Sequence, residues 1–306
     1  MKHFFKTSLI IFGIALMTLF ACKKDNETDP LSGPTNMKEF FSENEPANQR
    51  FTVNSSTGGS ITGSKGTEIT IPPNAFKKAD GTPVTGNVTI ELKELFEKSE
   101  MILSDKPTVS YGQILVSGGE FYISASQNGE ELRLNNTSLS VSTPTDSIDY
   151  NMNLFTGVST DTGFSWIPAN QGTNPDTMRF QTSFPYSYLY EIDSLGWINC
   201  DYFYFDPKPK YDLNVNFSSR PNDVAVYFVF NQINSVARAY DWDNNLEFEG
   251  LQIPQGQSIT VVAIGVDSNG KYYMASEDIT ISGNTTATLS MIEVTKNALM
   301  SMLNNL

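Results

Sequence analysis

From residue 51 onward the chain is a succession of short apolar or alternating runs separated by turn residues, and this pattern limits the fold more than any other feature. Half-buried strands alternate apolar and polar side chains, whereas helices repeat apolar residues at the longer spacing of a helical turn. No helical pattern of useful length occurs in residues 51–145. We therefore predict an all-β protein built from tandem antiparallel β-sandwich domains.

Turn residues and prolines divide the expected strands into three sections. Residues 51–145 should form one β-sandwich, with strands at 60–62, 68–71, 87–95, 112–116, 120–125 and 138–142. Residues 146–210 form an aromatic-rich β section, with strands at 151–156, 164–167, 178–184, 187–192, 197–200 and 202–205. After Pro207 and Pro209, residues 211–306 have the length of an immunoglobulin-like β-sandwich, with strands at 212–217, 225–231, 247–251, 258–266, 271–278 and 286–294. At about 150 residues per domain, the whole chain allows two domains or three small ones.

The end of the chain has a helical pattern. Thr295 is a suitable N-cap, and apolar residues follow at helical spacing: Ala298, Leu299, Met302, Leu303 and Leu306. We expect a short C-terminal helix that packs on the last domain.

Two prolines should end an early strand. Pro72 and Pro73 cannot donate hydrogen bonds to a sheet, so the strand that reaches Ile71 must stop or lie at an edge there. We expect Ala75 and Phe76, which follow, to fold back onto the sandwich as an apolar plug.

The first 21 residues have the pattern of an export signal. Lys2 and Lys6 precede an apolar run at 9–20, which is shorter than the roughly 18 residues that a membrane-spanning helix needs. The order Leu19-Phe20-Ala21-Cys22 resembles the lipobox of bacterial lipoproteins, in which a peptidase cuts before a cysteine that carries diacylglycerol. The resemblance implies a mature chain that begins at lipidated Cys22 and is anchored by its acyl chains. The alternative is a plain secretory signal with a coincidental cysteine.

Residues 22–50 are expected to be the lipidated cysteine and a flexible spacer, because they are polar and rich in proline and glycine. Residues 37–41 could instead make a helical turn or place their aromatic side chains on the first domain. The sequence Lys23-Lys24-Asp25-Asn26-Glu27 resembles the export tag that sends lipoproteins of Bacteroidota-type bacteria to the outer face of the outer membrane, although Asn26 interrupts the acidic pair. This resemblance implies surface display, and a periplasm-facing location is the alternative.

Charge and composition exclude several classes of protein. The net charge of −14 repels phosphate backbones and anionic lipid headgroups, so we expect no nucleic-acid partner and no membrane contact other than the lipid on Cys22. The only histidine, His3, lies in the export signal, which leaves no histidine for a nucleophile pair or a usual zinc site. With Cys22 lipidated, Cys200 has no partner for a disulfide, and we expect it to be a small buried residue. No cofactor is expected.

A family resemblance covers about a third of the chain. It comprises Gly58-Gly59, the run Ile-Thr-Ile-Pro-Pro-Asn-Ala-Phe at 69–76, and Gly-Asn-Val-Thr-Ile at 86–90. These residues resemble the ZU-five domain, a β-sandwich module of ankyrins, netrin receptors and tight-junction scaffold proteins. They are more similar still to a group of Bacteroidota lipoproteins that carry such a module after the lipobox, followed by a segment like Leu-Gly-Trp-Ile-Asn-Cys-Asp at 195–201. The resemblance implies an interaction module rather than an enzyme. Self-cleavage at a His-Phe-Ser site, known in some eukaryotic relatives, does not carry over, because the histidine is missing.

Aromatic residues supply the best candidate ligand patch. Tyr186, Tyr188 and Tyr190 alternate and should share one face of a strand, and Trp197 follows nearby. Such a platform can stack on sugar rings or carry a protein interface. The alternative is that these aromatic residues simply favour half-buried strand faces.

A metal site has only weak support. Asp241, Asp243 and Asn245 present alternating oxygen ligands like the start of a calcium loop. The glycine and the second acid that an EF-hand needs are replaced by Leu246 and Gln252. A solvated turn is the alternative.

These observations favour a non-catalytic cell-envelope lipoprotein that mediates protein or polysaccharide contact at the outer membrane. The alternative is a carboxylate-dependent glycan-active enzyme or its accessory binding subunit, which would need two carboxylates facing each other across a cleft beside aromatic side chains. A third hypothesis, assembly by strand exchange, requires an exposed strand edge.

Overall fold

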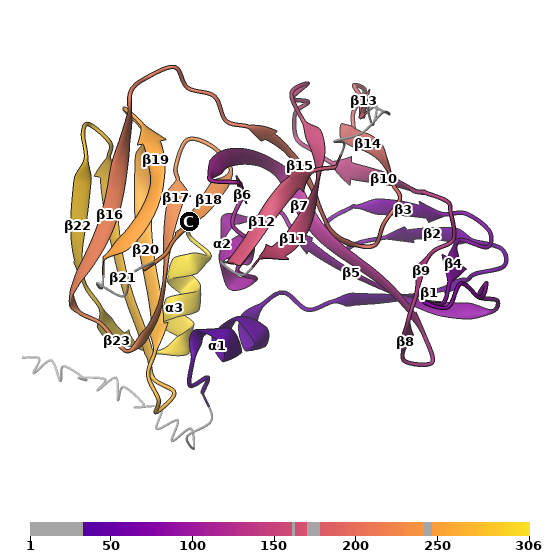
Figure 1. The fold of residues 1–306 in the computed structure, drawn as a ribbon, viewed down its shortest axis with the longest axis horizontal. Helices are drawn as coiled ribbons and strands as arrows, with labels where there is room; N and C mark the ends of the chain where they lie inside the picture. Colours follow the sequence, from indigo (N-terminus) through magenta and orange to yellow (C-terminus); the bar gives the residue numbers. More distant parts are fainter. Residues whose placement is uncertain (1–32, 161–162, 170–177, 242–246) are drawn as a thin grey trace, which may run out of the picture. The chain divides into compact units, whose positions relative to one another are not determined.

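The computed structural model describes residues 33–160, 163–169, 178–241 and 247–306 of the chain. Strands make up most of this part and the helices are short, which confirms the predicted all-β class. The strands build two β-sandwiches, each with its own apolar core (Figure 1). We call them the first sandwich, formed by β1 to β15, and the second sandwich, formed by β16 to β23.

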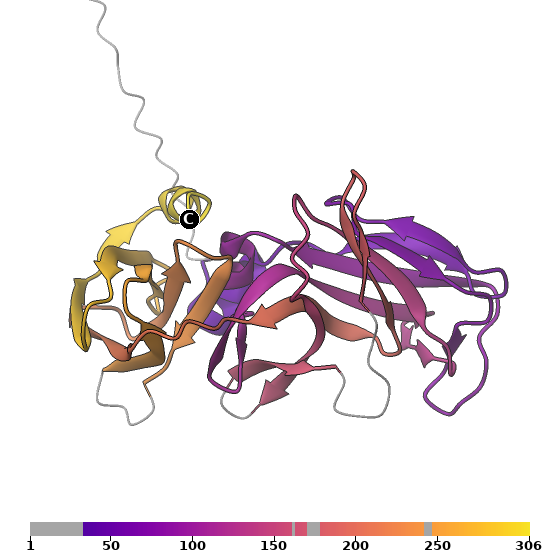
Figure 2. The same cartoon turned by 90° about the horizontal axis from the view of Figure 1, so that it is seen from above.

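Two antiparallel sheets make the first sandwich (Figure 2). The larger sheet has the order β1 (Gln49–Asn54), β5 (Asn87–Leu95), β7 (Gln113–Gln127), β15 (Gly196–Phe203), β11 (Asn153–Thr160) and β12 (Gly163–Pro168), with β6 (Val109–Ser110) and β8 (Glu130–Glu131) also on β7. The smaller sheet has the order β13 (Arg179–Gln181), β14 (Ser187–Ile192), β10 (Leu139–Pro144), β3 (Glu68–Ile71) and β2 (Gly59–Thr62). A short pair joins β4 (Phe76–Lys77) to β9 (Arg133–Leu134). Alternate side chains of both sheets are buried between them, which is the expected consequence of the two-residue period of a strand.

The structure corrects the predicted boundary between 51–145 and 146–210. β7 of the first section pairs with β15 of the second, and β10 pairs with β14, so both sheets contain strands from both sections. The aromatic-rich section is therefore half of the first sandwich. The physical reason is that the buried edges of β7 and β10 need hydrogen-bond partners, which only the later strands supply.

The second sandwich contains a parallel pair that the sequence did not lead us to expect. Its smaller sheet has the order β19 (Phe248–Pro254), β16 (Lys210–Ser219) and β22 (Thr285–Ser290), and β16 and β22 run parallel. The larger sheet is antiparallel, with the order β18 (Ser235–Ala239), β17 (Asp223–Phe230), β20 (Ser258–Val266), β21 (Tyr272–Thr280) and β23 (Ile292–Val294). The all-antiparallel prediction for this section is therefore wrong at β22.

Several strand bounds are confirmed to the residue, at β3, β5, β14 and β20. The expected strands 112–116 and 120–125 are one continuous strand, β7, in which Gly118 and Gly119 form an irregularity of the pairing with β15, and the pairing continues at Ser117 and Glu120 on either side. The strand β3 ends at Ile71, and Ala75 and Phe76 are fully buried, which confirms the proline stop and the apolar plug.

The C-terminal helix is confirmed. α3 (Lys296–Leu303) begins at Thr295, whose side-chain oxygen accepts a hydrogen bond of 3.2 Å from the backbone N–H of Ala298. Its buried side chains, Leu299 and Leu303, pack in a cluster with residues of β17, β18 and β20, and the helix lies against β21. A second helix, α2 (Lys98–Leu103), follows β5 and has no counterpart among the predictions.

The flexible spacer predicted for 22–50 ends earlier than expected, because the helix α1 (Met37–Asn44) packs on the second sandwich. Asn36 caps this helix by accepting a hydrogen bond of 2.9 Å from the backbone N–H of Glu39. Met37 and Phe40 are buried against β17 and β20, and the backbone N–H of Met37 donates to Asp223 at 2.8 Å. The alternative of a helical turn at 37–41 is confirmed, but its aromatic residue Phe40 packs on the second sandwich and not on the first domain.

The segment between α1 and β1 is held by an ion pair. The ammonium of Lys93 on β5, which is 5% exposed, lies 2.6 Å from the carboxylate of Glu45. Removal of the partner of such an enclosed charge is costly, so this pair fixes where the chain passes from α1 to the first sandwich.

We expect Phe40→Ala to release α1 from the second sandwich. Deleting a fully buried phenylalanine ring costs about 3–5 kcal/mol, which exceeds what an eight-residue helix can offset by itself. Limited proteolysis of the full-length protein should then cut between α1 and β1. Glu43→Ala, at an exposed position of the same helix, is the control, and equal protease resistance of both variants would contradict the prediction.

Candidate functional site

Two of the predicted patch residues lie in the core of the first sandwich. Tyr188 and Tyr190 on β14 are each 1% exposed. The hydroxyl of Tyr190 is 2.6 Å from that of Thr143, and the hydroxyl of Tyr188 accepts a hydrogen bond of 3.0 Å from the backbone N–H of Asp149. The shared face that the alternation predicts exists, but it points inward, so these two tyrosines cannot form a surface platform.

Trp197 lies apart from them, in the other sheet. It is half-buried on β15, with its ring centroid 5.3 Å from that of Tyr122 and 6.1 Å from that of Phe164. The ammonium of Lys106 lies 5.1 Å from the Trp197 centroid, a cation–π arrangement. The structure therefore does not bring Trp197 together with the three tyrosines.

Tyr186 is the patch residue that does border a cleft. It precedes β14 and is half-buried, and its ring meets that of Phe184 edge to face at 6.1 Å. The Phe184 side chain is 86% exposed in the turn between β13 and β14. Both rings line a cleft of about 480 Å³, which we call the Phe184 cleft; it is lined among others by Lys65, Phe96, Thr145, Phe184, Tyr186 and Asn234.

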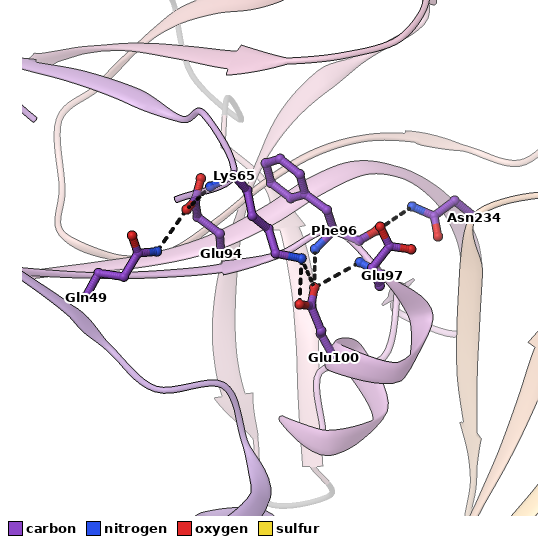
Figure 3. A network of polar contacts seen from close by, with 7 residues as sticks. All are labelled: Gln49, Lys65, Glu94, Phe96, Glu97, Glu100 and Asn234. Carbon is purple, nitrogen blue, oxygen red and sulfur yellow. Dashed lines mark hydrogen bonds and ion pairs between the residues drawn. The ribbon is translucent and has the colours of Figure 1, made fainter. Parts of the chain in front are cut away.

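A hydrogen-bonded network positions the polar side of this cleft (Figure 3). The carboxylate of Glu100 on α2 accepts hydrogen bonds from the backbone N–H groups of Phe96 at 2.9 Å and Glu97 at 3.1 Å. It also accepts one of 2.6 Å from the ammonium of Lys65, which lies 5.8 Å from the Phe96 ring centroid. Lys65 is therefore held in place, and its charge is compensated within the cleft wall.

The loop that carries Lys65 is fixed by a buried carboxylate. Glu94, which is 3% exposed, accepts hydrogen bonds from the backbone N–H of Lys65 at 3.0 Å and from the side chain of Gln49 at 2.9 Å (Figure 3). It also accepts one of 3.0 Å from the backbone N–H of Thr67. A Cβ on Gly63 would lie 2.3 Å from a Glu94 oxygen. The turn between β2 and β3 thus needs both the carboxylate and the glycine.

Asn234, in the turn between β17 and β18, closes the cleft from the second sandwich. Its side-chain amide donates to the backbone oxygens of Phe96 at 3.3 Å and Ser117 at 3.0 Å, and its own backbone oxygen accepts a hydrogen bond of 2.9 Å from the N–H of Ser117. Two exposed or half-buried rings beside these fixed polar groups can bind a sugar ring or an aromatic-rich segment of a protein. Sequence reasoning missed Phe184, Lys65 and Asn234; the only signal was an aromatic residue beside Pro185.

A pair of buried carboxyl groups also escaped sequence reasoning. Glu120 on β7 and Asp201 on β15 are both 0% exposed, and the side-chain amide of Asn199 lies 3.4 Å from Glu120 and 2.7 Å from Asp201. Burial raises the pKa of both carboxyls well above their usual range, and the neighbouring Asp201 raises the pKa of Glu120 further. Glu120 Oε2 and Asp201 Oδ1 have no hydrogen-bond partner in the described part of the chain, so the protonated forms are favoured.

The remaining predicted sites lie mostly outside the described residues. These include Cys22, Asp243 and Asn245, whereas Asp241 is described. Among the residues that the structure describes, no three His, Cys, Asp or Glu side chains are grouped so that they could hold a metal ion. Within the same residues, no helix has the length and apolar character to cross a membrane. Cys200 is buried, as predicted, and burial raises the pKa of its thiol.

Mutations of cleft and core residues should differ in their effect on the free energy of unfolding. Phe184→Ala removes a ring that is 86% exposed and should change the free energy of unfolding by less than about 0.5 kcal/mol. Tyr188→Ala empties a core position and should cost about 3–5 kcal/mol. Urea unfolding of the two variants measures both values, and a large loss for Phe184→Ala would show that the ring is structural.

The buried carboxyl pair predicts a dependence of stability on pH. Because the pKa of each group is higher in the folded than in the unfolded protein, the folded state binds more protons. This contribution is complete below about pH 4, the usual range of free carboxyls, and is lost as the pH rises through the raised pKa values. Glu120→Gln should therefore gain thermal stability relative to wild type as the pH rises above about 4. Glu131→Gln, an exposed site, is the control, and a difference that is constant with pH would contradict the prediction.

In comparisons with known proteins, no family model, no curated protein and no solved structure matches this chain. The resemblance to the ZU-five domain and to Bacteroidota lipoproteins stays a prediction that depends on the residues quoted for it.

Proposed function

We propose that this protein is a non-catalytic, lipid-anchored component of the cell envelope that holds a polysaccharide chain in the Phe184 cleft. The observation that carries the proposal is the Phe184 side chain, a large ring that is 86% exposed, adds little to the core and stands beside Tyr186 at a cleft. Exposed aromatic side chains grouped at a cleft are typical of ligand-binding surfaces.

The chemistry of the cleft supports a polysaccharide over other ligands. Ring faces pack on the apolar faces of sugars, and sugar hydroxyl groups can donate to the side-chain oxygen of Asn234, whose N–H groups are used by Phe96 and Ser117. The ammonium of Lys65 is paired with Glu100, so the cleft does not offer a free cation for a strongly anionic ligand. A protein segment rich in aromatic residues is the second candidate occupant.

The lipid anchor would keep this cleft near the envelope. The lipobox-like order that ends at Cys22 and the tag-like residues after it support attachment to the outer membrane and display at the cell surface. A net charge of −14 supports the same picture, because it disfavours contact of the protein surface with anionic lipid.

The location is tested on intact cells that produce wild type or Cys22→Ala. We expect wild type to sediment with the outer membrane and to be digested by external protease, and Cys22→Ala to lose the membrane association. Protection of wild type from protease on intact cells would contradict surface display.

The cleft is tested by glycan-array binding of the full-length protein in non-ionic detergent. Phe184→Ala and Tyr186→Ala should each weaken binding at least about fivefold, which corresponds to about 1 kcal/mol of lost ring packing. Phe205→Ala, at a position 83% exposed and outside the cleft, is the matched control. If all three variants retain glycan binding, the Phe184 cleft is not the binding site. Hydrolysis of a bound glycan would contradict the non-catalytic assignment.

A further inference from the structure

A second hollow, independent of the Phe184 cleft, is lined by aromatic side chains of both sandwiches. It has a volume of about 280 Å³, and we call it the Tyr240 pocket; the residues that matter for the argument are Tyr111, Phe164, Arg238, Tyr240, Glu249 and Leu251. An engineered apolar cavity of about 150 Å³ binds benzene, so this pocket has room for a molecule of two fused rings.

One wall of the pocket follows from strand pairing. The backbones of Tyr240 and Glu249 bond to each other in both directions, at 3.0 and 2.9 Å, so the two side chains lie opposite each other on one face. Arg238 and Leu251 lie two residues away on the same face. Ala239 is in the core, and a Cβ on Gly250 would collide with Phe228 there, so this face turns away from the core and into the pocket.

The facing wall comes from the first sandwich. The ring of Phe164 on β12 meets that of Trp166 edge to face at 5.0 Å, and the indole N–H of Trp166 donates to the backbone oxygen of Pro107 at 3.0 Å. Tyr111, which is 68% exposed, is tied to this wall because its backbone N–H donates to the hydroxyl of Ser165 at 3.3 Å. The pocket therefore presents ring and aliphatic surface on both sides.

Two charged side chains line the pocket, and one of them is already paired. Arg238 is paired with the carboxylate of Asp105, which also accepts a hydrogen bond of 2.7 Å from the hydroxyl of Tyr227. The ammonium of Lys106 lies 4.5 Å from the Phe164 ring centroid, so this ring already has a cation on it. Glu249 makes no side-chain hydrogen bond or ion pair with another residue that the structure describes, so it can accept a hydrogen bond from a ligand.

From this arrangement we propose that the Tyr240 pocket binds a small, uncharged bicyclic aromatic molecule that carries one N–H or O–H donor. The rings would lie between Phe164 and Tyr240, and the donor would face the carboxylate of Glu249. The carboxylate of Glu249 disfavours an anionic ligand, and the ring-lined walls disfavour a strongly hydrated ion.

The test compares indole with 1-methylindole, which has the same ring system without the donor, by isothermal titration calorimetry on the full-length protein in non-ionic detergent. Wild type should bind indole at least threefold more tightly than 1-methylindole. Glu249→Ala should abolish this preference, whereas Glu277→Ala, an exposed acid on β21, should keep it. Leu251→Trp should fill the pocket and weaken both probes at least tenfold.

Several results would overturn the proposal: no binding of either probe up to its solubility, binding that Leu251→Trp leaves unchanged, or equal affinity of wild type for both probes. A thermal melt of each variant shows whether it is folded. If Leu251→Trp does not fold, the proposal is tested by Glu249→Ala alone, because Glu249 is at an exposed position. Glycan binding by the same variants should be unchanged, so failure of this proposal and failure of the Phe184 cleft are distinguishable.

Discussion

Strand β7 needs hydrogen-bond partners along both of its edges, and the first sandwich depends on how they are supplied. β5, which precedes β7 in the chain, takes one edge, and β15, from much later in the chain, takes the other. This pairing draws β11 and β12 into the larger sheet, and it brings β14 beside β10 in the smaller one. Near its start, β7 also carries Ser117, whose backbone is bonded to Asn234 of the second sandwich. The Phe184 cleft forms where the β7–β15 pairing, the β10–β14 pairing and the hydrogen bonds between Ser117 and Asn234 come together.

Local chemistry made part of this fold predictable. The alternation at 68–71 and 258–266, the proline pair after Ile71 and the cap at Thr295 all act within a few residues, and each has the predicted structural effect. Pairing between distant strands was not predictable, because nothing in the local pattern of β15 says that β7 is its neighbour. The same limit explains why the boundary near 145 and the direction of β22 were wrong.

The candidate site shows how far the sequence pattern can predict the exposure of side chains. Alternation correctly places Tyr188 and Tyr190 on one face, but it cannot say whether that face is inside or outside. Phe184 is exposed because it lies in a turn, outside any periodic pattern. Glu120 and Asp201 are polar residues on strands, where a polar side chain normally indicates a solvated face, yet both are fully buried. Their raised pKa values therefore follow from the folded structure and not from the sequence pattern.

The parallel pair of β16 and β22 sets an order of assembly. The strands of the first sandwich are all present once the ribosome has made β15, so that sandwich can close early. β16 must wait for β22, which is synthesised after β17 to β21, before its sheet is complete. Until then, one edge of β16 has no hydrogen-bond partner, and the core lacks Ala287 and Leu289. A chain that terminates shortly before Thr285 would therefore have a complete first sandwich joined to an incomplete second one. Its unpaired strand edge and exposed apolar surface would make this product prone to aggregation and degradation.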